Sequence, residues 1–176
     1  MNTRPTLSAG AIALALTLGV PVSAQTDGGW HHYVNSRFHF AIDIPDRLLR
    51  TLPPPDNGDG RGFVARRGTA EGSAAGSYNT EHKTLADLAS DAERRCVNHR
   101  ASYRIVRANF MALSCELTGK RIFYTRSFTR GDEDIVATFD FSYLDAERAI
   151  WNPVVAQMSR SFQPTHNAAQ YSDDRR

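Results

Sequence analysis

Four consecutive stretches in the second half of the chain have the residue pattern of β-strands and follow one another with little intervening sequence. In the last stretch, apolar residues occupy every second position from Ile135 to Tyr143. Strand side chains alternate between the two faces of a sheet, so this pattern predicts one buried and one more polar face. The stretches are residues 102–108, 110–117, 121–130 and 134–144. Gly119 and Gly131 lie in the short connections and suit hairpin turns, so we expect an antiparallel sheet.

Strand patterns also occur in the first half of the chain. Residues 31–45 predict a hairpin, in which the apolar positions 38, 40, 42 and 44 alternate with more polar ones. Pro45 ends its second strand, because proline cannot continue a ladder. A short strand is expected from Gly62 to Arg66. A weaker one is expected within residues 72–78, where glycine and alanine leave room for a closely packed group.

Two helices are expected to cover this sheet. Thr84 and Asp87 form a capping pattern ahead of an apolar stripe at positions 85, 88, 89 and 92, and Cys96 continues the stripe. The last helix is expected in two parts, residues 145–151 and a second part that Asn152 caps and Pro153 begins. Its predicted buried face consists of Val154, Val155, Met158 and Phe162. The fold class predicted is therefore α+β, an antiparallel β-sheet covered by two main helices.

The first residues have the features of a secretory signal peptide. Arg4 precedes an apolar run over residues 9–20. The small residues that a signal peptidase recognises follow this run and end at Ala24. The run is short for a membrane span, although an uncleaved anchor is the alternative. No cysteine stands at the cleavage point to accept a lipid. We expect a signal peptide at 1–24, a mature N-terminal segment at 25–30, a single domain at 31–164 and a polar flexible tail at 165–176, in a periplasmic or secreted protein.

The charge of the chain is nearly balanced. It contains 21 Lys and Arg and 19 Asp and Glu residues, a formal net charge of +2, and the signal peptide holds one of the basic residues. This balance, with export, argues against a nucleic-acid partner. No later apolar stretch approaches membrane length, so we expect no transmembrane segment after signal cleavage.

The two cysteines, Cys96 and Cys115, predict a disulfide, because an even pair in an exported protein is usually oxidised. Closing the loop between these two cysteines adds roughly 3 kcal/mol to the free energy of unfolding, because the bond constrains the unfolded chain. The alternatives are a redox pair, which more often has C-x-x-C spacing, and a metal site using Cys96 and His99, for which two further ligands are not evident.

Several local patterns resemble the PsbP-like α/β/α sandwich, and more narrowly a group of small exported bacterial proteins of unknown role. The matching pieces are YVNSRFHFAIDIP, PPPDNGDGRGF, GSYN, RIFYTRSF and AERAIWNPVVAQMSRSF. His39 stands where a glycine is common in that group, and the cysteine pair is an addition. Photosynthetic members of the wider fold bind an oxygen-evolving complex, and nothing in this sequence carries that role over. The resemblance implies a fold and leaves function open.

One loop is a candidate ligand site. Its residues Asp56, Asn57, Asp59 and Arg61 follow three prolines. They do not keep the alternation of a calcium loop, and the segment leads into a strand rather than the helix of a phosphate loop. The competing interpretation is a stiff turn, in which Asp and Asn bond the backbone and glycine reverses the chain.

A basic cluster is the second candidate. It consists of Arg94, Arg95, Arg100, Arg104 and Arg107. It predicts an anionic partner such as a lipid headgroup, a cell-wall polymer or an acidic protein. The competing interpretation is a solvated face, and Arg104 and Arg107 face opposite ways in a regular strand.

No catalytic motif is evident in the sequence. The six histidines have no zinc spacing, and no G-x-S-x-G elbow occurs. We therefore expect no metal, no cofactor and an exported non-enzymatic module that binds an unidentified envelope partner or anionic ligand. The alternatives are a small periplasmic hydrolase using histidine and acidic residues brought together by folding, and a structural envelope-maintenance factor. The oligomeric state is left open.

Overall fold

The computed structural model describes residues 29–130 and 134–165. The predicted signal peptide, the turn glycine Gly131 and the tail beyond residue 165 lie outside this part of the chain. No helix within it is long and apolar enough to cross a membrane.

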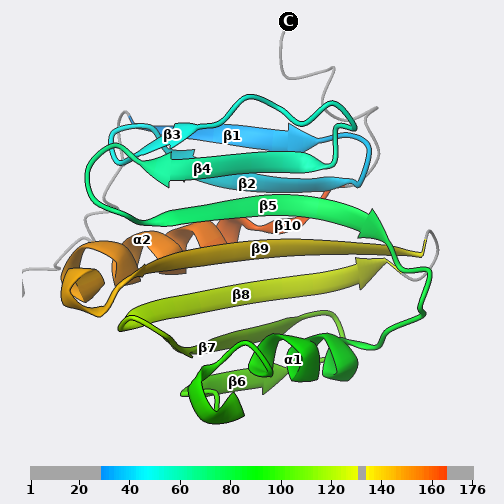
Figure 1. Ribbon diagram of the computed structural model, residues 1–176. Coiled ribbons are helices and arrows are strands. Elements are labelled where there is room, and N and C mark those ends of the chain that lie inside the picture. Colours follow the sequence, from blue (N-terminus) through cyan, green and yellow to red (C-terminus); the bar gives the residue numbers. More distant parts are fainter. Residues whose placement is uncertain (1–28, 131–133, 166–176) are drawn as a thin grey trace, which may run out of the picture.

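A seven-stranded antiparallel sheet forms the centre of the protein and confirms the predicted fold class (Figure 1). The strand order is β3-β4-β5-β9-β8-β7-β6. The strands are β3 (Leu49–Thr51), β4 (Gly60–Ala65), β5 (Glu71–Tyr78), β6 (Tyr103–Val106), β7 (Met111–Leu117), β8 (Arg121–Arg130) and β9 (Ile135–Leu144). The strand patterns of the second half are confirmed, and so is the weaker one at β5. The short strand β3 was not predicted, because three residues are too few to show a period.

The predicted hairpin forms a small sheet of its own rather than part of the large one. Strands β1 (Trp30–Asn35) and β2 (Phe40–Pro45) pair with each other, and β10 (Gln163–Pro164) pairs with β2. The alternation in β2 marks a buried face without identifying what covers it. In the structure, this face packs against α2 and the core, where the ring centroids of Phe40 and Phe162 lie 5.6 Å apart. His39 has a φ of 50°, which glycine adopts more easily.

Two helices lie on opposite faces of the large sheet (Figure 1). Helix α1 (Leu85–Glu93) begins at the predicted cap, where Thr84 and Asp87 form a capping box. The prediction for the last helix was wrong in one respect. Asn152 and Pro153 lie inside one continuous helix, α2 (Arg148–Ser161), which a 3-10 turn (Asp145–Glu147) precedes. Asn152 is used differently, since its side chain accepts a hydrogen bond from the Tyr143 hydroxyl.

The two faces of the large sheet bury two separate groups of apolar side chains. The larger core lies between the sheet, α2 and the hairpin, and is dominated by aromatic rings. It requires small residues in β5, because a Cβ added to Gly76 would overlap the Phe38 Cβ atom. The smaller core lies under α1 and contains both cysteines.

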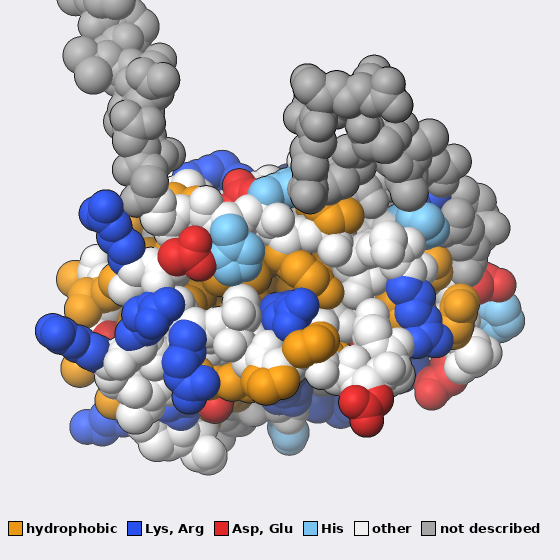
Figure 2. Space-filling model, turned by 90° about the horizontal axis from the view of Figure 1, so that it is seen from above, with side chains coloured by type: hydrophobic (Ala, Val, Ile, Leu, Met, Phe, Trp, Pro, Cys, Tyr) orange, Lys and Arg blue, Asp and Glu red, His pale blue; other side chains and the backbone are white. Residues whose placement is uncertain are grey.

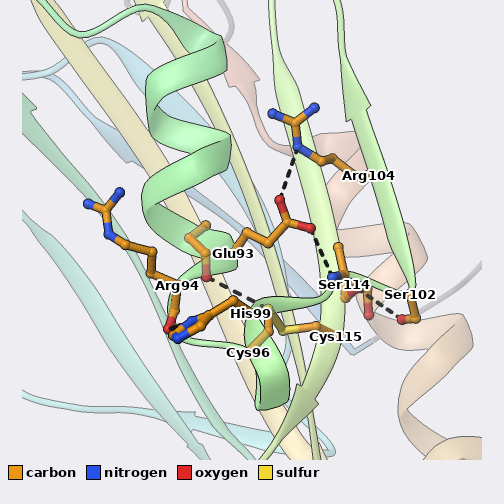
Figure 3. Close-up of a disulfide and its surroundings, with 10 residues drawn as sticks. Glu93, Arg94, Cys96, His99, Ser102, Arg104, Ser114 and Cys115 are labelled. Carbon is orange, nitrogen blue, oxygen red and sulfur yellow. Dashed lines mark hydrogen bonds and ion pairs between the residues drawn. A yellow bond between two sulfur atoms is a disulfide. The ribbon is translucent and has the colours of Figure 1, made fainter.

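The predicted disulfide joins Cys96, just after α1, to Cys115 in β7 (Figure 3). Both residues are buried. The bond occupies the Cys96 sulfur, so a metal site with His99 is not available. It fixes the end of α1 to the strand on which the helix packs.

We expect Gly76→Ala to lower the free energy of unfolding by about 2–3 kcal/mol, because the methyl group overlaps Phe38 and the strand must shift. Urea denaturation measures this change. Ser77→Ala, at the next and exposed position, should stay within about 0.5 kcal/mol of the wild type. Equal stability of the two variants would contradict the close packing of β5 on Phe38.

We expect replacement of both cysteines by alanine to lower the free energy of unfolding by about 2–4 kcal/mol, because the unfolded chain loses a constraint. Reduction of the wild-type protein should have a similar effect in urea denaturation. Thiol titration of the native, unreduced protein should detect no free thiol. One or more reactive thiols in freshly isolated protein would show that the bond is not formed.

Candidate binding cleft on the open sheet face

Helix α1 covers only part of the sheet face on which it lies. It has nine residues and contacts β6, β7 and β8. The neighbouring strands β4, β5 and β9 are not covered by it (Figure 1). The polar residues Ser73, Asp140 and Ser142 lie on this part of the face. A cleft of about 510 Å³ lies at one end of this uncovered half. Its lining includes Leu52, Val64, Glu71, Ser73, Arg95, Leu117, Thr118, Arg121, Asp140 and Ser142.

Arg95 reaches the cleft from the end of α1. One terminal nitrogen lies 3.0 Å from Asp140 Oδ2 in β9, and the guanidinium stacks 4.1 Å above the Phe123 ring. A planar guanidinium suits both contacts. The side chain remains 53% exposed. Arg95 is therefore held in place by two contacts while part of it still faces solvent.

Arg121 is the second cationic residue of the cleft, and its donors are largely used within the protein. Its Nη2 atom donates to Ser142 Oγ at 2.8 Å and to the Thr69 carbonyl at 3.0 Å. Glu71 lies 3.8 Å away, and only 22% of the Arg121 side chain is exposed. Arg121 therefore fixes the wall of the cleft and connects β8, β9 and the start of β5.

Asp140 supplies an acceptor at the floor. It lies opposite Ser73 in β5 and Thr125 in β8. Its Oδ2 atom contacts Arg95, whereas Oδ1 is buried with no hydrogen-bond partner among the described residues. The cleft thus places a partly exposed guanidinium beside a carboxylate oxygen that has acceptor capacity left.

The predicted arginine cluster does not converge on one point. Arg94 pairs with Asp91 at 2.6 Å, and Arg104 lies 3.6 Å from Glu93. Arg95 alone belongs to the cleft. Arg100 and Arg107 are exposed and flank the two ends of β6. Anion binding by these residues stays a prediction.

The proline-rich loop has the geometry of a turn. The amide of Gly58 donates to the Pro55 carbonyl at 3.0 Å, and Gly58 has a φ of 66°. Asn35 and Arg37 of the hairpin bind the carbonyls of Gly58 and Asn57. Of the predicted loop residues, Asp59 lies 3.4 Å from Arg37, Arg61 stacks on Tyr33, and Asp56 is exposed. Ligand binding at this loop stays a prediction.

None of the described histidines is among the residues that line the cleft. His31 pairs with Asp46 and His32 with Asp43, each at 2.6 Å, on the hairpin. Figure 2 looks down on this side of the molecule, where Lys, Arg, His and acidic side chains are interspersed among hydrophobic ones. No group of three His, Cys, Asp or Glu in the described ranges is arranged to hold a metal.

A second hollow, of about 310 Å³, lies between α2 and the strands β6 to β9. Its walls include Tyr103, Tyr124 and Tyr143. Burial raises the pKa of Tyr124 and of Tyr143, so both hydroxyls are protonated at neutral pH. Tyr124 bonds Ser159 at 2.6 Å and Tyr143 bonds Asn152 at 2.6 Å, whereas about half of Tyr103 is exposed.

Sequence reasoning missed Arg121, Asp140 and the tyrosine hollow. Asp140 is a polar position in an alternating strand, and this pattern alone does not separate a solvated carboxylate from one in a cleft. The small residues of β5 were the available signal, since they leave the floor open.

Comparison with known structures identifies the fold. The solution structure of cyanobacterial PsbP (CyanoP) from Synechocystis sp. PCC 6803 matches with a TM-score of 0.58 and 15% identity, over 89% of this chain and 97% of that one. A mutant of the protein Mog1 matches with a TM-score of 0.54 and 9% identity, over 82% of this chain and 100% of that one. The Saccharomyces cerevisiae Ran-binding protein Mog1p matches with a TM-score of 0.52 and 10% identity, over 77% and 95%.

These similarities show a Mog1/PsbP-like fold and, at such low identity, nothing of function. A scan against models of protein families finds no match, and a search of curated proteins finds none either.

We expect Arg121→Ala to lower the free energy of unfolding by about 1–2 kcal/mol, because Ser142 and Thr69 lose a charged hydrogen-bond donor. Urea denaturation measures this effect. Arg67→Ala, at an exposed position near the same loop, serves as the control and should change stability by less than about 0.5 kcal/mol. An Arg121 variant as stable as this control would show that the residue does not fix the cleft wall.

Proposed function

We propose that this protein is an exported, non-enzymatic α+β module that binds a partner or ligand in the cell envelope, with an anionic group of the bound molecule placed against Arg95. On its sequence patterns, we place it among the small exported bacterial proteins that resemble PsbP. The disulfide supports an oxidising compartment, in which such bonds persist.

The partly exposed Arg95 guanidinium carries this proposal. Among the described residues, its one hydrogen-bonding contact is with Asp140. A guanidinium has five N–H donors, so donors remain for a carboxylate or phosphate. The contacts with Phe123 and Asp140 already order the side chain, which reduces the entropy lost when a ligand binds.

The composition of the cleft favours binding over hydrolysis. It contains Ser73, Ser142 and Asp140, but no histidine is among its lining residues. The two histidine–aspartate pairs of the hairpin belong to a different sheet. Among the described residues that line this cleft, a serine activated by a histidine therefore has no counterpart.

We expect a photo-cross-linking amino acid at Val64, on the cleft wall, to form adducts in living cells with a partner from the envelope. Arg95→Gln should lower the yield about tenfold or more, since a charged hydrogen bond contributes about 1.5–3 kcal/mol. Mass spectrometry of the adducts identifies whether the partner is a protein, a lipid or a glycan.

Arg94→Gln is the matched control. This arginine precedes Arg95 but pairs with Asp91 and does not line the cleft. Its variant should cross-link as the wild type does. Absence of any adduct at Val64, or equal adduct yields with and without the Arg95→Gln substitution, would refute binding at this cleft.

A further inference from the structure

Strand β6 forms an edge of the large sheet with unpaired backbone groups. Among the described residues it pairs with β7 alone. The Arg107 amide donates to the Phe110 carbonyl at 2.8 Å, and the register places Ile105 opposite Ala112. Backbone groups alternate in direction along an antiparallel ladder, so the N–H and C=O groups of Arg104 and Val106 point away from β7. Figure 1 shows β6 at the end of the sheet opposite to the small sheet.

Basic residues surround this edge. Residues 100–107 contain three arginines and no acidic residue. Arg100 and Arg107 are exposed at the two ends of β6. Arg104, in the strand itself, reaches Glu93 of α1 at 3.6 Å, and Glu93 also accepts a hydrogen bond from the Ala101 amide (Figure 3). The Glu93 carboxylate is therefore shared between Arg104 and the Ala101 amide, and the β6 edge keeps an excess of positive charge.

Charged edge strands commonly protect a sheet from pairing with another copy of itself. Here, two β6 strands brought together would place arginine near arginine, which is unfavourable. The same charges attract an acidic strand, so one feature both excludes self-association and selects a partner.

The face of β6 that carries Tyr103 offers a contact for a large side chain. Tyr103, Ser114 and Tyr124 lie opposite one another on β6, β7 and β8. The small Ser114 between two tyrosines contributes to the hollow of about 310 Å³. Tyr103 is 48% exposed, so a side chain of an added strand on this face would pack against its ring.

We propose that an extended acidic segment of a partner protein adds to β6 as a further strand of the large sheet. The outward backbone groups of Arg104 and Val106 pair with it, as in other cases of strand addition. Its acidic side chains lie on the Arg104 face, with Arg100 and Arg107 adding positive charge at the two ends of the strand, and an aromatic side chain on the other face contacts Tyr103. This surface is separate from the cleft, and the proposal does not depend on Arg95.

A synthetic peptide tests this inference directly. The probe is a capped nine-residue peptide in which aspartate alternates with valine and one central phenylalanine. In nuclear magnetic resonance titrations of the full mature protein, we expect shifts centred on β6 and at least tenfold slower hydrogen exchange of the Val106 amide. A peptide with lysine in place of aspartate should bind at least tenfold more weakly.

Two matched changes separate strand addition from simple charge attraction. An acidic peptide with N-methyl groups on alternate amides keeps its charge but cannot complete the ladder, and it should bind at least tenfold more weakly. Arg100→Glu combined with Arg107→Glu should reverse the preference toward the lysine peptide. Equal binding of the methylated peptide, shifts centred on the cleft, or no binding of the acidic probe would each overturn the proposal.

Discussion

The pairing of β5 with β9 is the constraint on which the rest of the structure depends. Eight residue pairs, from Glu71 with Ser142 to Tyr78 with Ile135, join the first half of the chain to the second. The strands on either side of this pair are joined to it by local hairpins, each of which closes a short loop. The β5–β9 pairing closes a long loop. This pairing is possible because β5 consists mostly of small residues, among which Gly72 and Gly76 let neighbouring aromatic rings approach the backbone.

The same pairing determines where a ligand can bind. On one face, β5 and β9 lie under the aromatic core and the hairpin. On the other face, the short α1 and its disulfide stay over β6 to β8. Ser73, Asp140 and Ser142 are consequently left at the floor of a cleft, with Arg95 reaching over it from the end of the helix. A longer helix, or a larger residue in β5, would fill this space.

Ion pairs within the protein determine which arginines can still contact a bound molecule. Arg94, Arg95 and Arg104 each have a carboxylate partner, and Arg121 donates to backbone and hydroxyl groups. The cleft therefore presents an ordered and partly neutralised guanidinium, which suits specific recognition. The β6 edge presents positive charge with less compensation, which suits attraction of an acidic chain. The two surfaces differ in chemistry and lie on different parts of one sheet.

The sequence by itself determined the strands with a clear period of two, the capped start of α1, the cysteine pair and the α+β class. These features depend on neighbours in the chain, so a local pattern is sufficient to predict them. Only the tertiary structure decided that residues 31–45 form a separate sheet, that Pro153 lies within α2, and that Arg95 meets Asp140 while its neighbour Arg94 does not. Each of these outcomes depends on groups far apart in sequence coming together. A pattern of alternation states that a face is buried, but it cannot state what buries it.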